Sequence, residues 1–244
     1  MHARPAHAHD GRVRGKPRHT GPDEDRPDRV GHSPAVRRGP TFSVADLGCG
    51  TGYYAESLVE RVPVARLLAA DRSPDAVRAT LRALTDRVPT TGIVLDLWRP
   101  LPLRDASADV LLDVFAPRNP REYARVLRPG GALIVVVPTA AHLLGLRESA
   151  GMLDIPGGKD VLVTEQFAAV GLQVASAARV EYVIESDAST RTLIAGMGPA
   201  AHHHQPDGEG SPAARAGTEA SVTGTRADST PVTVSVDVLT FQKP

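Results

Sequence analysis

Apolar and polar residues alternate along the chain in blocks that predict strands and helices in turn. Short apolar runs predict strands at about 43–47, 66–71, 92–96, 108–115, 132–137 and within 172–185, and strict alternation predicts a last strand at 232–241. Helical segments are predicted at about 53–61, 74–87, 120–126, 140–149, 161–170 and 189–197. Strands separated by helix-length segments favour an α/β fold with a doubly wound, mostly parallel sheet. Because no crossover helix directly precedes the final strand, we expect that strand to be antiparallel.

Two stretches lack this pattern. Residues 1–40 are rich in Pro, Arg and His and have too few apolar residues to offset the entropy of ordering, so we predict a disordered tail. Residues 203–230 are polar and small, which predicts a mobile loop within a domain spanning 41–244. The tail carries nine Arg or Lys residues and five acids, so its net charge of +4 leaves −4 on the rest of a neutral chain. A basic tail is weak support for a nucleic-acid partner.

Length and composition narrow the class of protein. A chain of 244 residues with 41% hydrophobic residues suits one domain with appendages. No apolar run approaches the roughly 18–20 residues of a membrane helix, and the N-terminus lacks the apolar segment of a signal peptide. We therefore expect a cytoplasmic protein without a membrane partner. The single cysteine excludes an intrachain disulfide and a cysteine-based zinc finger, and we predict no metal site.

The stretch from Val44 to Tyr54 contains the strongest signal. A buried strand ends near Asp46, and Gly48, Gly50 and Gly52 follow at alternate positions before a predicted helix begins at Tyr53. Glycines can adopt positive φ and let a ligand approach the backbone. The free N–H groups of the following helix point back toward such a ligand. The pattern predicts a ligand-binding turn.

Three acids close successive predicted strands. Asp46 precedes the glycine turn, Asp71 ends the second strand and Asp96 ends the third. Open α/β sheets bind ligands at the carboxyl ends of their strands. At that edge Asp71 could accept hydrogen bonds from ribose hydroxyls, and Asp96 from an adenine amine, with Leu97 or Trp98 against the ring. The acids therefore predict a nucleoside-binding site.

The glycine spacing separates classes of cofactor. The pattern G-x-G-x-G differs from the dinucleotide fingerprint G-x-G-x-x-G, and no Lys-Ser/Thr follows as in a P-loop. The segment from Asp46 to Gly52 resembles motif I of class I S-adenosylmethionine (SAM)-dependent methyltransferases, and Leu127–Gly131 resembles the turn before their fifth strand. The resemblance implies a seven-stranded Rossmann-like sheet and SAM as cofactor. It implies these cofactor-binding residues: Asp46, Gly48, Gly50, Gly52, Tyr53, Asp71, Arg72, Asp96, Leu97 and Phe115.

A narrower resemblance concerns the methyl acceptor. The segment from Asp113 to Pro120, with Val137-Pro138, His142-Leu143 and the late segment 195–199, is similar to bacterial 23S rRNA guanine-N1 methyltransferases, which include macrolide-resistance enzymes. It implies an rRNA substrate. That family carries an N-terminal zinc module with several cysteines, whereas this chain has no cysteine before Cys49. Because this chain differs from the family in that module, a small heteroaromatic natural product remains the alternative substrate. A homodimer is also possible.

Candidate catalytic residues follow from the chemistry of methyl transfer. The reacting atoms must be aligned, and a ring nitrogen must lose its proton, which calls for a carboxylate or histidine near the acceptor. Asp113, His142 and His202 are the candidates for this base. Asn119 could hydrogen-bond a base edge beside the rim formed by Phe115 and Pro117. A structural role for Asp113 is equally compatible with the sequence.

Overall fold

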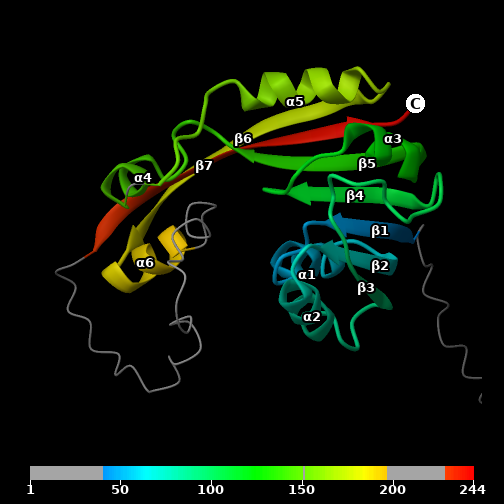
Figure 1. Ribbon diagram of the computed structural model, residues 1–244, viewed down its shortest axis with the longest axis horizontal. Helices are drawn as coiled ribbons and strands as arrows, with labels where there is room; N and C mark the ends of the chain where they lie inside the picture. Colours follow the sequence, from blue (N-terminus) through cyan, green and yellow to red (C-terminus); the bar gives the residue numbers. More distant parts are fainter. Residues whose placement is uncertain (1–40, 151, 197–228) are drawn as a thin grey trace, which may run out of the picture. The chain divides into compact units, whose positions relative to one another are not determined.

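The computed structural model describes residues 41–150, 152–196 and 229–244 (Figure 1). The predicted tail, His202 and most of the predicted loop at 203–230 lie outside these ranges. The strands are β1 (Phe42–Leu47), β2 (Val64–Asp71), β3 (Thr90–Val94), β4 (Ala108–Val114), β5 (Leu127–Pro138), β6 (Gln173–Ser186) and β7 (Thr230–Gln242). The helices are α1 (Tyr53–Val59), α2 (Pro74–Ala83), α3 (Pro120–Val126), α4 (Leu144–Ala150), α5 (Lys159–Ala168) and α6 (Ala188–Gly196).

All seven strands form one mixed sheet in the order β3-β2-β1-β4-β5-β7-β6 (Figure 1). Strands β3, β2, β1, β4 and β5 are parallel, and β7 runs antiparallel between β5 and β6. The predicted doubly wound sheet with an antiparallel last strand is confirmed. Because β1 to β5 are parallel, their carboxyl ends meet at one edge, where ligands bind in such folds.

Side chains that alternate along the strands build two cores, one on each face of the sheet. Leu112 packs in a cluster with Ala55 of α1 and Val77 of α2. Its neighbour Leu111 packs on the other face, in a cluster with Tyr123 of α3 and residues of α5. Helices α1 and α2 therefore cover one face, and α3 and α5 cover the other.

The second helix begins as the sequence predicts. The hydroxyl of Ser73 accepts a hydrogen bond from the backbone N–H of Ala76 at 3.3 Å, and Pro74 is the first helical residue. This cap fixes the chain direction immediately after Asp71, the last residue of β2. It thereby positions one of the predicted ligand-binding acids.

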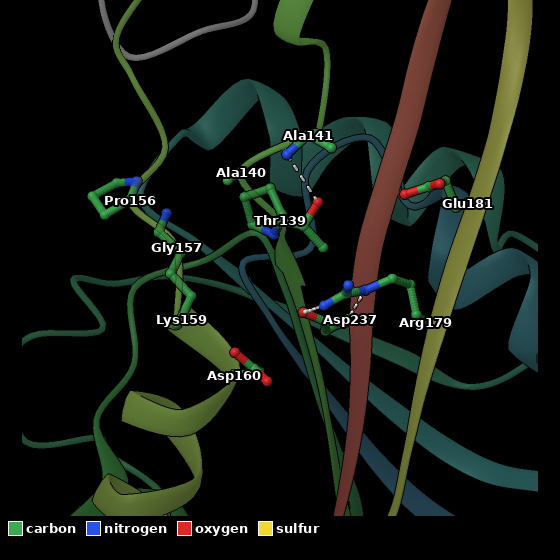
Figure 2. A pocket seen from close by; sticks show the side chains of 12 residues that line it. Thr139, Ala140, Ala141, Pro156, Gly157, Lys159, Asp160, Arg179, Glu181 and Asp237 are labelled. Carbon is green, nitrogen blue, oxygen red and sulfur yellow. Dashed lines mark hydrogen bonds and ion pairs between the residues drawn. The ribbon is translucent and has the colours of Figure 1, made fainter.

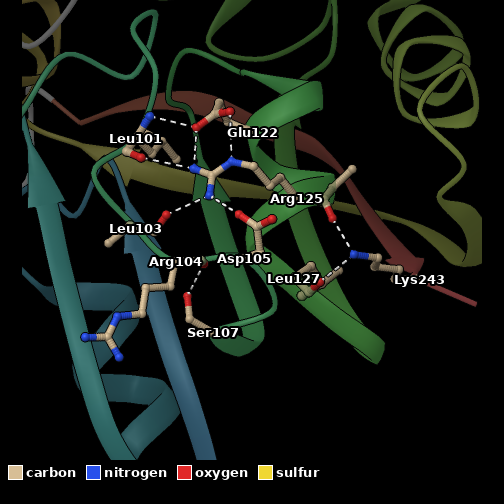
Figure 3. A network of polar contacts seen from close by, with 10 residues as sticks. Leu101, Leu103, Arg104, Asp105, Ser107, Glu122, Arg125, Leu127 and Lys243 are labelled. Carbon is tan, nitrogen blue, oxygen red and sulfur yellow. Dashed lines mark hydrogen bonds and ion pairs between the residues drawn. The ribbon is translucent and has the colours of Figure 1, made fainter.

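The segment between β3 and β4 has no regular structure, and Arg125 of α3 ties it in place (Figure 3). The guanidinium donates to the carbonyls of Leu101 and Leu103 and to the carboxylates of Asp105 and Glu122, at 2.6–3.0 Å. Glu122 also accepts from the backbone N–H of Leu101 at 2.7 Å. The loop that carries the residues after β3 is therefore anchored to α3.

Some boundaries differ from the prediction. Strand β3 ends at Val94, so Asp96 lies two residues beyond it. Helix α4 starts at Leu144 and not near 140, because the preceding residues pair with β7: Thr139 donates to the carbonyl of Ser235 and Leu143 to that of Thr233. Thr230, predicted in the loop, is the first residue of β7.

Candidate functional site

The glycine turn has the backbone that its sequence requires. Gly48, Gly50 and Gly52 have φ angles of 91°, 53° and 92°, in the region that L side chains rarely adopt. A Cβ on Gly48 would lie 2.4 Å from the Cβ of Ala116, and one on Gly52 would lie 3.0 Å from the backbone of Thr80. Nothing lies within 4 Å of a Cβ built on Gly50. The turn is closely packed at its two ends and open at its centre.

Asp71 fixes the open part of this turn. One carboxylate oxygen accepts the backbone N–H of Gly50 at 3.0 Å, and the other accepts that of Ser73 at 2.9 Å. Thr80, which sequence reasoning did not identify, donates a hydrogen bond from its hydroxyl to the carbonyl of Gly50 at 3.0 Å. A carboxylate has about four acceptor sites, so Asp71 retains capacity for ligand hydroxyls.

A cleft of about 220 Å³ opens at the carboxyl edge of the sheet. Six of the ten predicted cofactor residues line it: Gly48, Asp71, Arg72, Asp96, Leu97 and Phe115. Leu95, Trp98, Val114, Ala116 and Pro117 complete the lining. Sequence reasoning missed Leu95 and Val114, although each directly precedes a predicted cofactor residue, Asp96 or Phe115.

The other four predicted cofactor residues do not line the cleft. Gly50 and Gly52 shape the turn behind it. Tyr53 is 68% exposed and contacts Tyr54 edge to face at 5.2 Å. Asp46 is buried, and burial together with the nearby charge of Asp71 raises its pKa to about 7. A ligand-binding role for these residues stays a prediction.

Asp113, one of the candidate bases, lies in the interior of the protein. Its side chain is fully buried, and its carboxylate accepts the Tyr123 hydroxyl at 2.9 Å. Burial raises the pKa of Asp113 to about 7, although the Tyr123 hydrogen bond and the charge of Arg118 act in the opposite direction. The carboxyl group has no exposed surface in this structure, and a role as the base stays a prediction.

Phe115 and His142 come together beside the cleft. Their ring centroids are 5.8 Å apart at an interplanar angle of 31°. Phe115 is 47% exposed and has a φ of 56°, a strained value for a residue with a bulky side chain. Such strain persists where the surroundings hold it, and the backbone N–H of Phe115 donates to Val136 at 3.1 Å. The pair forms an aromatic wall at the mouth of the cleft.

The contacts of His142 assign its protons. Its Nδ1 accepts the backbone N–H of Ser235 at 3.2 Å, so the neutral ring carries its proton on Nε2. Burial and the charge of Arg147 lower the pKa of His142, which favours this neutral form. In the neutral ring, Nδ1 therefore acts as an acceptor and Nε2–H as a donor. In this arrangement His142 is suited to donate a hydrogen bond through Nε2, and its role as the base stays a prediction.

Asn119 has structural contacts through its amide nitrogen, and the predicted hydrogen bond to a base edge, which its Oδ1 could still accept, stays a prediction. Its amide nitrogen donates to the carbonyls of Leu97 at 3.1 Å and Arg99 at 3.2 Å. Both amide hydrogens are then used inside the protein. Asn119 fixes the loop on either side of Trp98, so it shapes the rim of the cleft through the backbone.

A second cavity, of about 240 Å³, lies where β5 ends and α5 begins (Figure 2). Arg179 and Asp237 form a two-bond ion pair beside it at 2.9 and 3.1 Å. Burial and the charges of Arg118 and Arg147 lower the pKa of Lys159 on its rim. None of the predicted site residues lines this cavity. Within the described ranges, no three metal-ligating side chains cluster, and no helix has the length and hydrophobicity to cross a bilayer.

Comparison with known proteins decides the family. Residues 44–131 match the profile described as a methyltransferase domain. The chain is 37% identical over 177 residues to the 23S rRNA (guanine(748)-N(1))-methyltransferase of Streptomyces fradiae, across 71% of this chain and 60% of that protein. A protein of Micromonospora griseorubida named for 23S rRNA (guanine-N(1)-)-methylation is 40% identical over 164 residues, across 67% and 54%. The chain carries a class I SAM-dependent methyltransferase domain.

The fold of this methyltransferase domain agrees with that assignment. A solved structure from Bacillus halodurans, described as a methyltransferase, aligns with a TM-score of 0.53 and 13% identity, across 84% of this chain and 93% of that one. At that identity the likeness shows the fold alone. The chain spans 60% and 54% of the length of the two curated relatives.

The residues of the cleft fit SAM. Asp71 and Asp96 both line the cleft, and their carboxylates could accept hydrogen bonds from ribose hydroxyls and an adenine amine. The open face of Gly50 leaves room beside the turn, and Leu97 and Phe115 supply apolar walls. The residues that line the cleft are therefore suited to SAM, the cofactor that the sequence of the domain implies.

Proposed function

We propose that the protein methylates N1 of a guanine in 23S rRNA, using SAM. One observation carries this proposal. The similarity to two 23S rRNA guanine-N1 methyltransferases extends over 177 and 164 residues, well beyond the segment 44–131 that matches the general methyltransferase profile. A malonyl-[acyl-carrier protein] O-methyltransferase of Herminiimonas arsenicoxydans matches over a similar 168 residues but is 29% identical, against 37% and 40% for the two rRNA enzymes, so the higher identity favours an rRNA substrate.

Different residues of the chain would bind the cofactor and position the acceptor. Bound SAM would supply a methyl group that is already activated, so the protein mainly has to align the acceptor. Asp71 and Asp96 hold the cofactor end of the cleft. Phe115 and Pro117 line the end next to His142, where a planar base can pack against the aromatic wall.

His142 contributes a hydrogen bond to the acceptor. As guanine loses its N1 proton, negative charge spreads to O6 of the ring. The Nε2–H of His142 can donate to that oxygen and stabilise the charge, as preorganised donors do at other active sites. The proton itself leaves to solvent or to the RNA, because His142 has no free acceptor nitrogen.

Two further expectations belong to this function. We place the protein in the cytoplasm, the compartment of its ribosomal substrate. Expression in a sensitive bacterium should raise tolerance of a macrolide antibiotic, because methylation would alter the rRNA that the drug contacts. An Asp71→Ala variant serves as the inactive control.

Incubation with labelled SAM and two acceptor pools tests the proposal. One pool contains bacterial ribosomal RNA at low salt, and the other contains small aromatic metabolites. We expect label in 23S rRNA, with transfer that falls steeply as salt rises, because RNA binding releases counterions. Label only in the metabolite pool would replace this proposal with the small-molecule alternative.

A further inference from the structure

A groove lies next to the cofactor cleft and shares one wall with it. The groove has a volume of about 500 Å³ and lies between the start of α3 and the end of α5. Its lining consists of Trp98, Arg118, Asn119, Pro120, Arg121, Gln166, Ala169 and Val170. Trp98 also lines the cleft. Whatever occupies the groove is therefore adjacent to the site of methyl transfer.

Trp98 is an exposed aromatic side chain on a fixed backbone. The residue is 69% exposed, although it is large and apolar. Its backbone N–H donates to Asp96 at 3.0 Å, and the carbonyls of the residues on either side accept from Asn119. Three polar contacts thus immobilise the chain around it. A preorganised aromatic face loses little entropy when a partner stacks on it.

The groove is also positively charged. Arg118 and Arg121 line it, and its lining residues, all of them described, include no carboxylate. Neither arginine forms an ion pair with a described residue. The Nε of Arg118 is buried without a hydrogen-bond partner, and its Nη1 has only a long contact of 3.4 Å with the carbonyl of Ala116. The buried Nε of Arg118 cannot reach a phosphate, so this half-buried residue would contact one through its Nη atoms, whereas Arg121 is exposed; arginines beside an aromatic face are suited to a nucleic-acid strand.

We propose that this groove binds a single-stranded segment of the RNA acceptor, with an unpaired base stacked on Trp98 and phosphates held by Arg118 and Arg121. The proposal rests on the proposed function and adds a substrate class: RNA whose bases next to the target are unpaired. Unpaired bases are available for stacking, whereas those of a duplex are not. The shared wall formed by Trp98 places the strand beside the cleft in which its guanine would react.

Trp98 is the only tryptophan of the chain, so its fluorescence reports on this groove directly. We expect a short single-stranded RNA to quench the emission in a saturable way, and a duplex of the same sequence to quench it much less. SAM alone should leave it nearly unchanged. Quenching by SAM without quenching by RNA would assign Trp98 to the adenine and overturn the proposal.

Substitutions distinguish the contribution of base stacking on Trp98 from that of the arginine charges to RNA binding. Trp98→Ala should weaken RNA binding by about 5- to 150-fold, and Trp98→Phe should weaken it less, because a stacked base contributes on the order of 1–3 kcal/mol. Arg121→Ala should reduce the slope of log K against log salt by about one phosphate contact. Arg82→Ala is the matched control, since it removes an exposed arginine from α2 on the opposite face of the sheet. SAM affinity should be unchanged in Arg121→Ala and Arg82→Ala, because neither residue lines the cofactor cleft.

The outcomes distinguish the two proposals. If wild-type protein methylates rRNA while Trp98→Ala and Arg121→Ala bind RNA as well as Arg82→Ala does, the groove proposal is wrong and the proposed function stands. If wild-type protein neither binds nor methylates RNA, both are wrong. Loss of RNA affinity in the Trp98 and Arg121 variants alone supports the groove.

Discussion

Replacing Asp71 with alanine should disable the cofactor site with little effect on the fold. The carboxylate accepts the N–H groups of Gly50 and Ser73 at 3.0 and 2.9 Å, and its remaining sites face the cleft. A hydrogen bond to a charged group contributes about 1.5–3 kcal/mol. Loss of two ribose hydrogen bonds therefore predicts a SAM affinity lower by at least about a hundredfold, since 1.4 kcal/mol corresponds to a factor of ten.

Isothermal titration calorimetry with SAM measures this change, and urea unfolding measures the accompanying loss of stability, which we expect to be about 3 kcal/mol, from two hydrogen bonds to a charged group at about 1.5 kcal/mol each. Asp71→Asn should lie between wild type and alanine, because the amide keeps one acceptor oxygen but no charge. Asp75→Ala removes a nearby acid that does not line the cleft and serves as the control. A folded Asp71→Ala protein that binds SAM with wild-type affinity would refute the assignment of Asp71 to the ribose.

Three other substitutions test separate parts of the site. Tyr123→Phe removes the donor to the buried Asp113 carboxylate and should lower the free energy of unfolding by about 1–3 kcal/mol in urea titrations. Burial raises the pKa of Asp113 from 3.8 to about 7, so the folded protein retains a proton that the unfolded chain releases, and this group lowers stability as pH rises from about 4 to about 7. Asp113→Asn should therefore lose less stability than wild type between pH 4 and pH 7, as measured by urea unfolding at each pH. His142→Ala should lower kcat while SAM affinity stays unchanged, and His142→Gln, which keeps an N–H donor, should restore part of kcat.

Specific results would contradict each of these expectations. An unchanged stability of Tyr123→Phe would show that the hydroxyl is replaced by another donor. A parallel pH dependence of Asp113→Asn and wild type would mean that Asp113 titrates normally in the folded protein. Recovery of turnover by a carboxylate at position 142, but not by Gln, would restore the role of a base.

The features that depend mainly on residues close together in the sequence were predicted correctly. Glycines at 48, 50 and 52 are needed for positive φ and close packing, so their spacing revealed the turn directly. Acids at the ends of consecutive parallel strands must meet at one edge, so Asp71 and Asp96 were found together in the cleft. The length of β5 was underestimated, because a turn-like Pro-Gly-Gly segment still pairs with the C-terminal strand through Lys243.

The contacts that the sequence could not predict involve partners far along the chain. Asp113 lies near the end of a predicted strand, and the sequence does not show that Tyr123, on helix α3, donates a hydrogen bond to its buried carboxylate. The tautomer of His142 is set by Ser235, 93 residues later. Asn119 was assigned to a base edge, but its amide is used by carbonyls of a loop about 20 residues earlier. Side-chain type shows what a residue can bind, and only the fold shows which partner it has.

Reverse transcription across 23S rRNA tests the central claim most directly. A methyl group on N1 removes the Watson–Crick donor of guanine, so the transcriptase should stop one nucleotide before it. In RNA from a host lacking this modification, we expect one new stop when the wild-type protein is expressed and none with Asp71→Ala. A wild-type protein that is expressed and folded, binds SAM and leaves no stop in 23S rRNA would contradict the account.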